Sequence, residues 1–87
     1  MFLSTREKEI IEMLIKYHGQ YVTIYDIAQN LAVSSRTIHR ELKSIESFLS
    51  NFDIALERVT KKGIQLNTSE GALSSLKHAL LHENTID

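Results

Sequence analysis

Apolar residues keep a helical spacing through the first fifty residues of this chain and then alternate around a glycine. Repeats of three and four residues are typical of a helix with one buried face, whereas alternation is typical of a strand. The 87 residues include no proline and only three glycines, so we expect long elements with few breaks. This change of period restricts the fold to a group of helices followed by a β-hairpin.

Two capping patterns predict where the first two helices begin. In each, a hydroxyl and a carboxylate three residues apart satisfy free amides at the helix start. The two pairs are Ser4 with Glu7 and Thr23 with Asp26. They predict a helix over residues 5–17, which stops before Gly19, and a short helix over residues 24–31.

A third helix is predicted to begin near Ser35, with Ser34 or Ser35 as its cap. Its apolar stripe has steps of four, three and four and comprises Ile38, Leu42, Ile45 and Leu49. The interruption before this helix is brief, at residues 32–34. The second and third helices therefore form a candidate helix-turn-helix.

The rest of the chain predicts a hairpin and a final helix. Alternation over residues 54–60 and 64–67 predicts two strands around Lys61, Lys62 and Gly63. A helix over residues 69–82 then has an apolar row of Leu73, Leu76, Leu80 and Leu81. We expect a mainly α fold with a small β-hairpin, the winged helix-turn-helix: three helices, a two-stranded wing and a C-terminal linker helix.

The helix-turn-helix interpretation depends on a few positions in the second and third helices. A small residue, Ala28, stands where the two helices cross, and Val33 and Ile38 occupy the apolar positions that hold the turn. Ala32 stands where a glycine is common. The alternative is a pair of helices that serves only packing.

The third helix has a basic face opposite its apolar stripe. Counted at about 100° per residue from Ile38, that face carries Arg36, His39, Arg40 and Lys43. A helix in the major groove passes between phosphates, and arginine can read guanine through two hydrogen bonds. The alternative is a solvated face with pairs along the helix, such as Lys43 with Glu46. We favour DNA, because the element order and the basic face agree.

Contacts to the DNA backbone are predicted on both sides of this face. The hydroxyls and free amides at the helix start suit phosphates, and they belong to Ser34, Ser35 and Thr37. The wing would add Arg58, Lys61 and Lys62. The alternative for the wing is a lysine-rich turn that only protects a sheet edge.

Composition is consistent with a soluble DNA-binding domain. The net charge is −1, but residues 34–67 hold six bases and four acids. The absence of cysteine suits the cytoplasm, and the chain has no apolar run long enough for a membrane span. His78 and His82 lie four residues apart, but no third metal ligand is evident, so we interpret them as surface histidines. We expect no catalytic residues, no metal, no cofactor and no enzyme activity.

Residues 27–43, above all the run Ser35-Arg36-Thr37-Ile38-His39-Arg40-Glu41-Leu42, resemble a known family. They are similar to the N-terminal helix-turn-helix of bacterial regulators that carry phosphotransferase-system regulation domains, such as mannitol operon activators and related antiterminators. The starting Ser-Thr-Arg-Glu and the wing Lys-Lys-Gly-Ile-Gln-Leu are similar too. Parts are shared with other winged helices, including those of biotin-ligase repressors.

The resemblance implies a longer protein and several partners. Residues 1–67 would be the winged helix-turn-helix domain, and residues 68–87 a helix that leads into a missing downstream domain. The full protein would be a homodimer on operator or promoter DNA of a sugar-uptake operon, and further domains would contact phosphotransferase-system proteins. The family's phosphorylated histidines are not assigned to His78 or His82. RNA-binding antitermination and a winged helix used only for protein contact remain the alternative functions.

Overall fold

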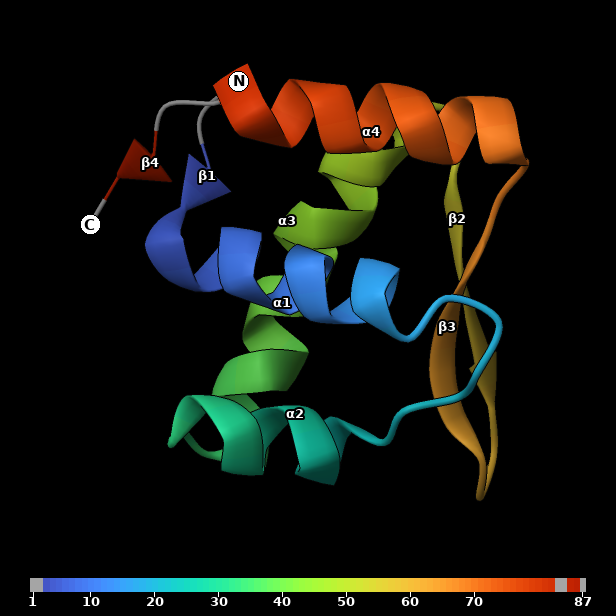
Figure 1. Cartoon of the computed structure of the whole chain (residues 1–87). Helices are drawn as coiled ribbons and strands as arrows, with labels where there is room; N and C mark the ends of the chain where they lie inside the picture. The colour runs from blue at the N-terminus through green and yellow to red at the C-terminus, as the bar shows by residue number, and fades with distance from the viewer. Residues whose placement is uncertain (1–2, 83–84, 87) are drawn as a thin grey trace.

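The structure is a computed structural model that describes residues 3–82 and 85–86. Its elements, in chain order, are β1 Leu3–Ser4, α1 Thr5–Lys16, α2 Ile24–Leu31, α3 Ser35–Ser50, β2 Ala55–Val59, β3 Gly63–Asn67, α4 Glu70–His82 and β4 Thr85–Ile86 (Figure 1). The order of helices and hairpin is the one that the sequence predicts. The fold is that of a winged helix, with the β2–β3 hairpin directly after α3.

Both predicted capping boxes are present. The Ser4 hydroxyl accepts from the Glu7 amide at 3.0 Å, and the Glu7 carboxylate accepts from the Ser4 amide at 2.8 Å. Thr23 and Asp26 make the same reciprocal pair at the start of α2. These bonds satisfy amides that have no partner within the helix, which is why α1 and α2 begin where predicted.

The end of α1 differs slightly from the prediction. The helix ends at Lys16, one residue early, and Tyr17 caps it with a negative φ of −101°. Gly19 has a φ of +91° but lies in the turn after the cap, so it redirects the chain without ending the helix itself.

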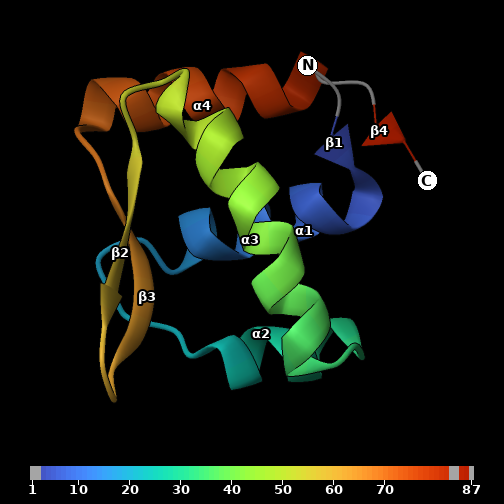
Figure 2. The same ribbon diagram turned by 180° about the vertical axis from the view of Figure 1, so that it is seen from behind.

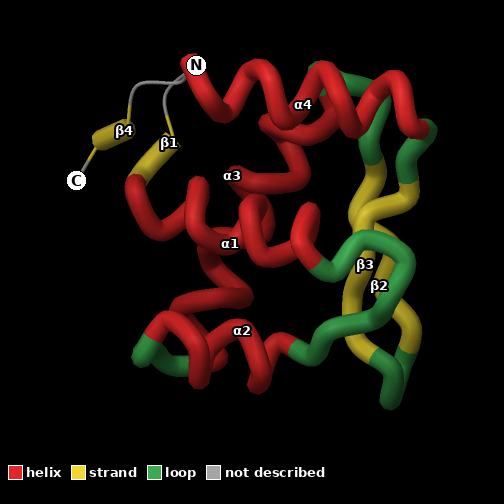
Figure 3. The backbone as a smooth tube through the Cα atoms, viewed as in Figure 1, coloured by secondary structure: helices red, strands yellow, loops and turns green. Residues whose placement is uncertain are grey.

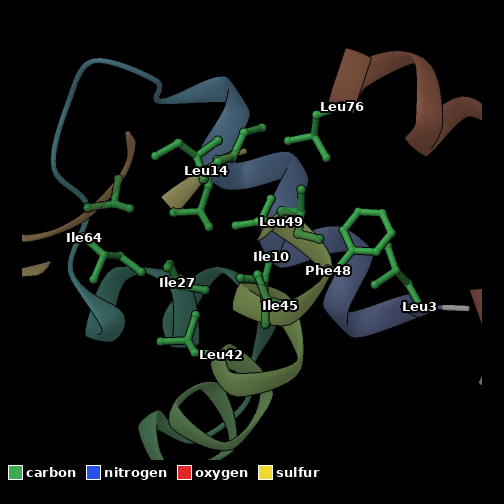
Figure 4. Packing of buried hydrophobic residues seen from close by; sticks show 14 of the residues in the cluster. Leu3, Ile10, Leu14, Ile27, Leu42, Ile45, Phe48, Leu49, Ile64 and Leu76 are labelled. Carbon is green, nitrogen blue, oxygen red and sulfur yellow. The ribbon is translucent and has the colours of Figure 1, made fainter. Parts of the chain in front are cut away.

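The hydrophobic core lies between α1, α3, the hairpin and α4 (Figure 4). All four residues of the predicted α3 stripe are fully buried, and Phe48 joins them. Ile10 and Leu14 of α1 face them from the other side, with Ile64 from β3. Burial of this one continuous cluster holds α3 at a fixed angle to the rest of the domain.

Helix α4 lies across the end of α3 that is far from α2 (Figure 2). Leu73, Leu76 and Leu80 are buried in the core, as predicted. The prediction that Leu81 belongs to the same row is wrong, because Leu81 is 80% exposed. It follows Leu80 by one position, about 100° around the helix, and so points away from the core.

The hairpin is antiparallel and gains a third backbone partner from the α1–α2 connector. Leu56 lies opposite Leu66, and Arg58 lies opposite Ile64. Val22 and Ile64 exchange two backbone hydrogen bonds of 2.9 and 2.8 Å, which attaches the connector to β3 (Figure 3). The wing is therefore tied to the α1–α2 connector along the β3 edge.

A second pairing was not predicted. Strands β1 and β4 are parallel, with Leu3 opposite Thr85 and Ser4 opposite Ile86. This short pair brings residues 3–4 and 85–86 together beside the N-terminus of α1 (Figure 1).

The turn between α2 and α3 contains a strained residue, which leads to our first prediction. Ala32 has a φ of 56° and a ψ of 42°, a left-handed conformation that L residues other than glycine adopt at a cost. We expect Ala32→Gly to raise the free energy of unfolding by about 0.5–1 kcal/mol, measured by urea denaturation. Ala79→Gly in the interior of α4 is the control and should lower it by about 1 kcal/mol. Equal losses from both variants would contradict the prediction.

Candidate nucleic-acid interface

The helix-turn-helix is held together by the residues that the sequence singled out. Ala28 is buried on α2, and Ile38 is fully buried on α3. Val33 packs partly buried against the same cluster, and its amide donates to the Ala28 carbonyl at 3.0 Å. The turn is thus held by backbone hydrogen bonds from the Ala32 and Val33 amides back to α2 and by the packing of Val33 against the core, which sets the direction in which α3 leaves α2.

The predicted basic face is exposed. Arg36, His39, Arg40 and Lys43 are all exposed and lie in the first half of α3. Within residues 3–82 and 85–86, the ion pairs involve other side chains, so none of these four is neutralised by an acid. The structure brings together on one face the four side chains that the helical spacing grouped.

The two acids of α3 are paired with arginines from other elements. The Glu41 carboxylate Oε1 lies 3.6 Å from the guanidinium Nη1 of Arg6 in α1, and Glu46 pairs with Arg58 of β2. The alternative pair of Lys43 with Glu46 along the helix is absent from the described ion pairs. Arg58 therefore has a partner within the protein, which the sequence did not predict.

The hydroxyls at the start of α3 serve the helix cap. The Ser34 hydroxyl accepts from the Thr37 amide at 3.1 Å and lies 3.0 Å from the Thr37 hydroxyl. Only one of these two hydroxyls needs to donate to the other, so the second retains a proton for an acceptor outside the protein. Ser35 is half-buried at the first position of the helix.

The two wing lysines are exposed at the turn between β2 and β3. Lys61 has a φ of 71°, and the Lys62 amide donates to the Val59 carbonyl at 3.0 Å. The hairpin tip lies at the same end of the molecule as α2 and the start of α3 (Figure 1). The basic face of α3 and the lysines of the wing can therefore face one extended partner.

A polar cluster that the sequence did not predict braces the wing. The Tyr21 hydroxyl donates to the Glu57 carboxylate at 3.0 Å. The side-chain amide Nε2 of Gln65 donates to the same carboxylate oxygen at 2.6 Å. Desolvation and the neighbouring Glu57 carboxylate raise the pKa of Tyr21, so the phenol keeps its proton and remains a donor. The Lys62 ammonium lies 5.7 Å from the centre of the Tyr21 ring. Alternation along the two strands was a signal for part of this cluster, because Glu57 and Gln65 lie directly opposite each other.

The two histidines of α4 are the other site candidates that the sequence raised, and they form no metal site among the described residues. His78 and His82 have ring centres 4.7 Å apart on α4. The described residues contain no group of three or more histidine, aspartate or glutamate side chains that could hold a metal ion. Across the same residues, every helix is too short or too polar to cross a membrane.

Comparison with known proteins agrees with this geometry. The family model of the helix-turn-helix (HTH) domain matches residues 6–65. The chain is 31% identical over 84 residues to the transcriptional regulator ManR of Bacillus subtilis (strain 168). That match covers 95% of this chain but only 13% of ManR. A search of solved structures finds no match. Because the family model covers α1 through most of β3, the chain belongs to the helix-turn-helix domain family.

Proposed function

We propose that this chain binds double-stranded DNA in a sequence-specific manner and that it acts in transcription regulation. The observation that carries the proposal is the exposed face of Arg36, His39, Arg40 and Lys43, free of acids, on the second helix of a helix-turn-helix. A helix of this kind fits the major groove with its N-terminal half against the base edges. Arg36 and Arg40 are the side chains that would discriminate guanine.

In this proposal, contacts to the DNA backbone come from both ends of the same protein surface. Ser34, Ser35 and Thr37 lie where the helix N-terminus favours a phosphate. Lys61 and Lys62 lie on the wing, apart from the start of α3, and would neutralise further phosphates. These contacts add affinity without reading sequence, and they make binding depend on salt.

The proposal that the chain acts at a sugar-uptake operon rests on the resemblance of residues 27–43 to regulators that carry phosphotransferase-system regulation domains. ManR, to which the chain is similar, is by name a transcriptional regulator. In this proposal, residues 1–67 are the DNA-binding domain and residues 68–87 lead into further domains, which make the protein a homodimer and contact phosphotransferase-system proteins. A DNA-binding regulator of this type works in the cytoplasm.

Selection of duplexes from a random pool tests the proposal. We expect the chain to enrich a common site and to bind it more tightly than a scrambled duplex of the same length. The logarithm of the association constant should fall linearly with the logarithm of salt concentration. RNA hairpins of equal length serve as competitors. Preferential binding of the hairpins would favour an antiterminator, and no salt-dependent binding to either would leave only protein contact.

A further inference from the structure

We propose that Arg58 is a positioning residue rather than a residue that contacts phosphate. It neutralises Glu46, which lies at the edge of the basic face of α3. The inference rests on the proposed DNA binding and refines it. It replaces the expectation that Arg58 acts with Lys61 and Lys62 on the DNA backbone. The evidence comes from the direction of the Arg58 side chain, the position of Glu46 and a second pair of the same kind.

The strand geometry directs Arg58 toward α3. Arg58 lies opposite Ile64 in the hairpin, and Leu56 lies opposite Leu66. Residues directly opposite each other point to the same face of a sheet, and so do residues two apart on one strand. Ile64 and Leu66 are both buried in the core, so this is the inner face of the hairpin. Arg58 extends from the rim of that face and meets Glu46 of α3, with both side chains about half exposed.

Glu46 stands at the edge of the basic face. Counted from Ile38, it lies at about 80° around the helix, close in angle to His39 at about 100° but two turns further along the helix. It also follows Lys43 by three residues, a spacing at which opposite charges on a helix attract. Without Arg58, its carboxylate would draw Lys43 aside and repel an approaching phosphate. The pair with Arg58 removes both effects.

The other acid of α3 is also paired with an arginine. Glu41 lies at about 300° from Ile38, and its carboxylate pairs with Arg6 of α1. Glu41 and Glu46 are the acids that α3 contains, and each is paired with an arginine from outside the helix. Both acids of α3 therefore lie outside the basic face, Glu46 near its edge and Glu41 nearer the apolar stripe, and their charges are compensated by arginines of other elements.

Stability does not account for the Arg58 pair. Ion pairs between exposed side chains contribute little to folding, because water and salt screen them. A charge at the rim of a DNA-binding surface has a larger effect on binding, because it acts on a line of phosphates. We therefore expect Arg58→Ala to leave the thermal unfolding temperature almost unchanged and to weaken DNA binding.

A cycle of Arg58→Ala, Glu46→Gln and the double variant tests the inference on the duplex selected for the wild type. We expect Arg58→Ala to weaken binding roughly three- to ten-fold. In the Glu46→Gln background, the same substitution should change binding less than about two-fold, because no carboxylate remains to be neutralised. If Arg58 contacts phosphate directly, the loss will be as large in the Glu46→Gln background, and the inference is overturned.

Two further results separate this inference from the proposed function. If the wild type binds no duplex, the proposed function fails and the role of Arg58 with it. If the wild type binds but Arg58→Ala binds equally well, only the role of Arg58 fails. Lys77→Ala and Glu70→Gln on α4 are matched charge controls at the opposite end of the molecule, and both should bind like the wild type.

Discussion

Replacing Gly63 with alanine is expected to lower the free energy of unfolding by about 3–5 kcal/mol, a large effect for one methyl group. Gly63 has a φ of +116°, which an L side chain rarely adopts. A Cβ atom built there lies 2.3 Å from the carbonyl oxygen of Val22. That oxygen accepts the Ile64 amide, so the backbone cannot retreat without breaking the bridge between the connector and the wing. Urea denaturation followed by circular dichroism measures the loss.

The other two glycines are matched controls for this prediction. Gly19 also has a positive φ but has no atoms near its added Cβ, so Gly19→Ala should cost about 1–2 kcal/mol from backbone strain alone. Gly71 lies in α4 with open space around it, and Gly71→Ala should raise the free energy of unfolding by up to about 1 kcal/mol. A loss at Gly63 no larger than that at Gly19 would show that the close approach to Val22 does not matter.

Loss of both recognition arginines should have the largest effect on binding. We expect Arg36→Ala and Arg40→Ala each to weaken specific binding by about 1–3 kcal/mol, since each removes a candidate two-bond contact to a base. The double variant should approach the affinity of the wild type for scrambled DNA. Fluorescence anisotropy with the selected and the scrambled duplex measures both affinities.

Controls for the arginine variants test folding and charge separately. Both side chains are exposed on α3 and lack an acidic partner among the described ion pairs, so thermal unfolding should stay near that of the wild type. Arg36→Lys with Arg40→Lys keeps the charge but removes the paired donors, and it should retain binding to scrambled DNA while losing specificity. If the double alanine variant binds the selected duplex as the wild type does, α3 is not the recognition helix.

The local features of the fold were predictable from sequence. A capping box is formed by residues three apart, and the apolar stripe of α3 repeats within one helix, so neither depends on distant parts of the chain. Leu81 was placed wrongly because an apolar repeat of three and four residues does not decide how wide the buried face is. Sequence alone therefore leaves open whether the residue next to Leu80 also faces inward. The β1–β4 pair was missed because it joins residues from opposite ends of the chain, and no local pattern indicates such a pairing.

The same distinction separates the predicted and unpredicted parts of the candidate site. The basic face follows from the period of one helix, and the structure shows its four residues exposed as expected. The partners of Glu46 and Glu57 lie on other elements, so they depend on how the hairpin packs against α3 and against the α1–α2 connector. Charged residues could be assigned to elements from sequence, but which of them have a partner within the protein required the tertiary contacts.

The pairing of β1 with β4 has a consequence for anything attached to this domain. Both strands lie beside α4, while the hairpin tip and the start of α3 lie at the far end of the molecule (Figure 2). A fluorophore or an affinity tag attached next to β1 or β4 would therefore start on the side away from the proposed DNA surface and would leave the groove-facing side of α3 open.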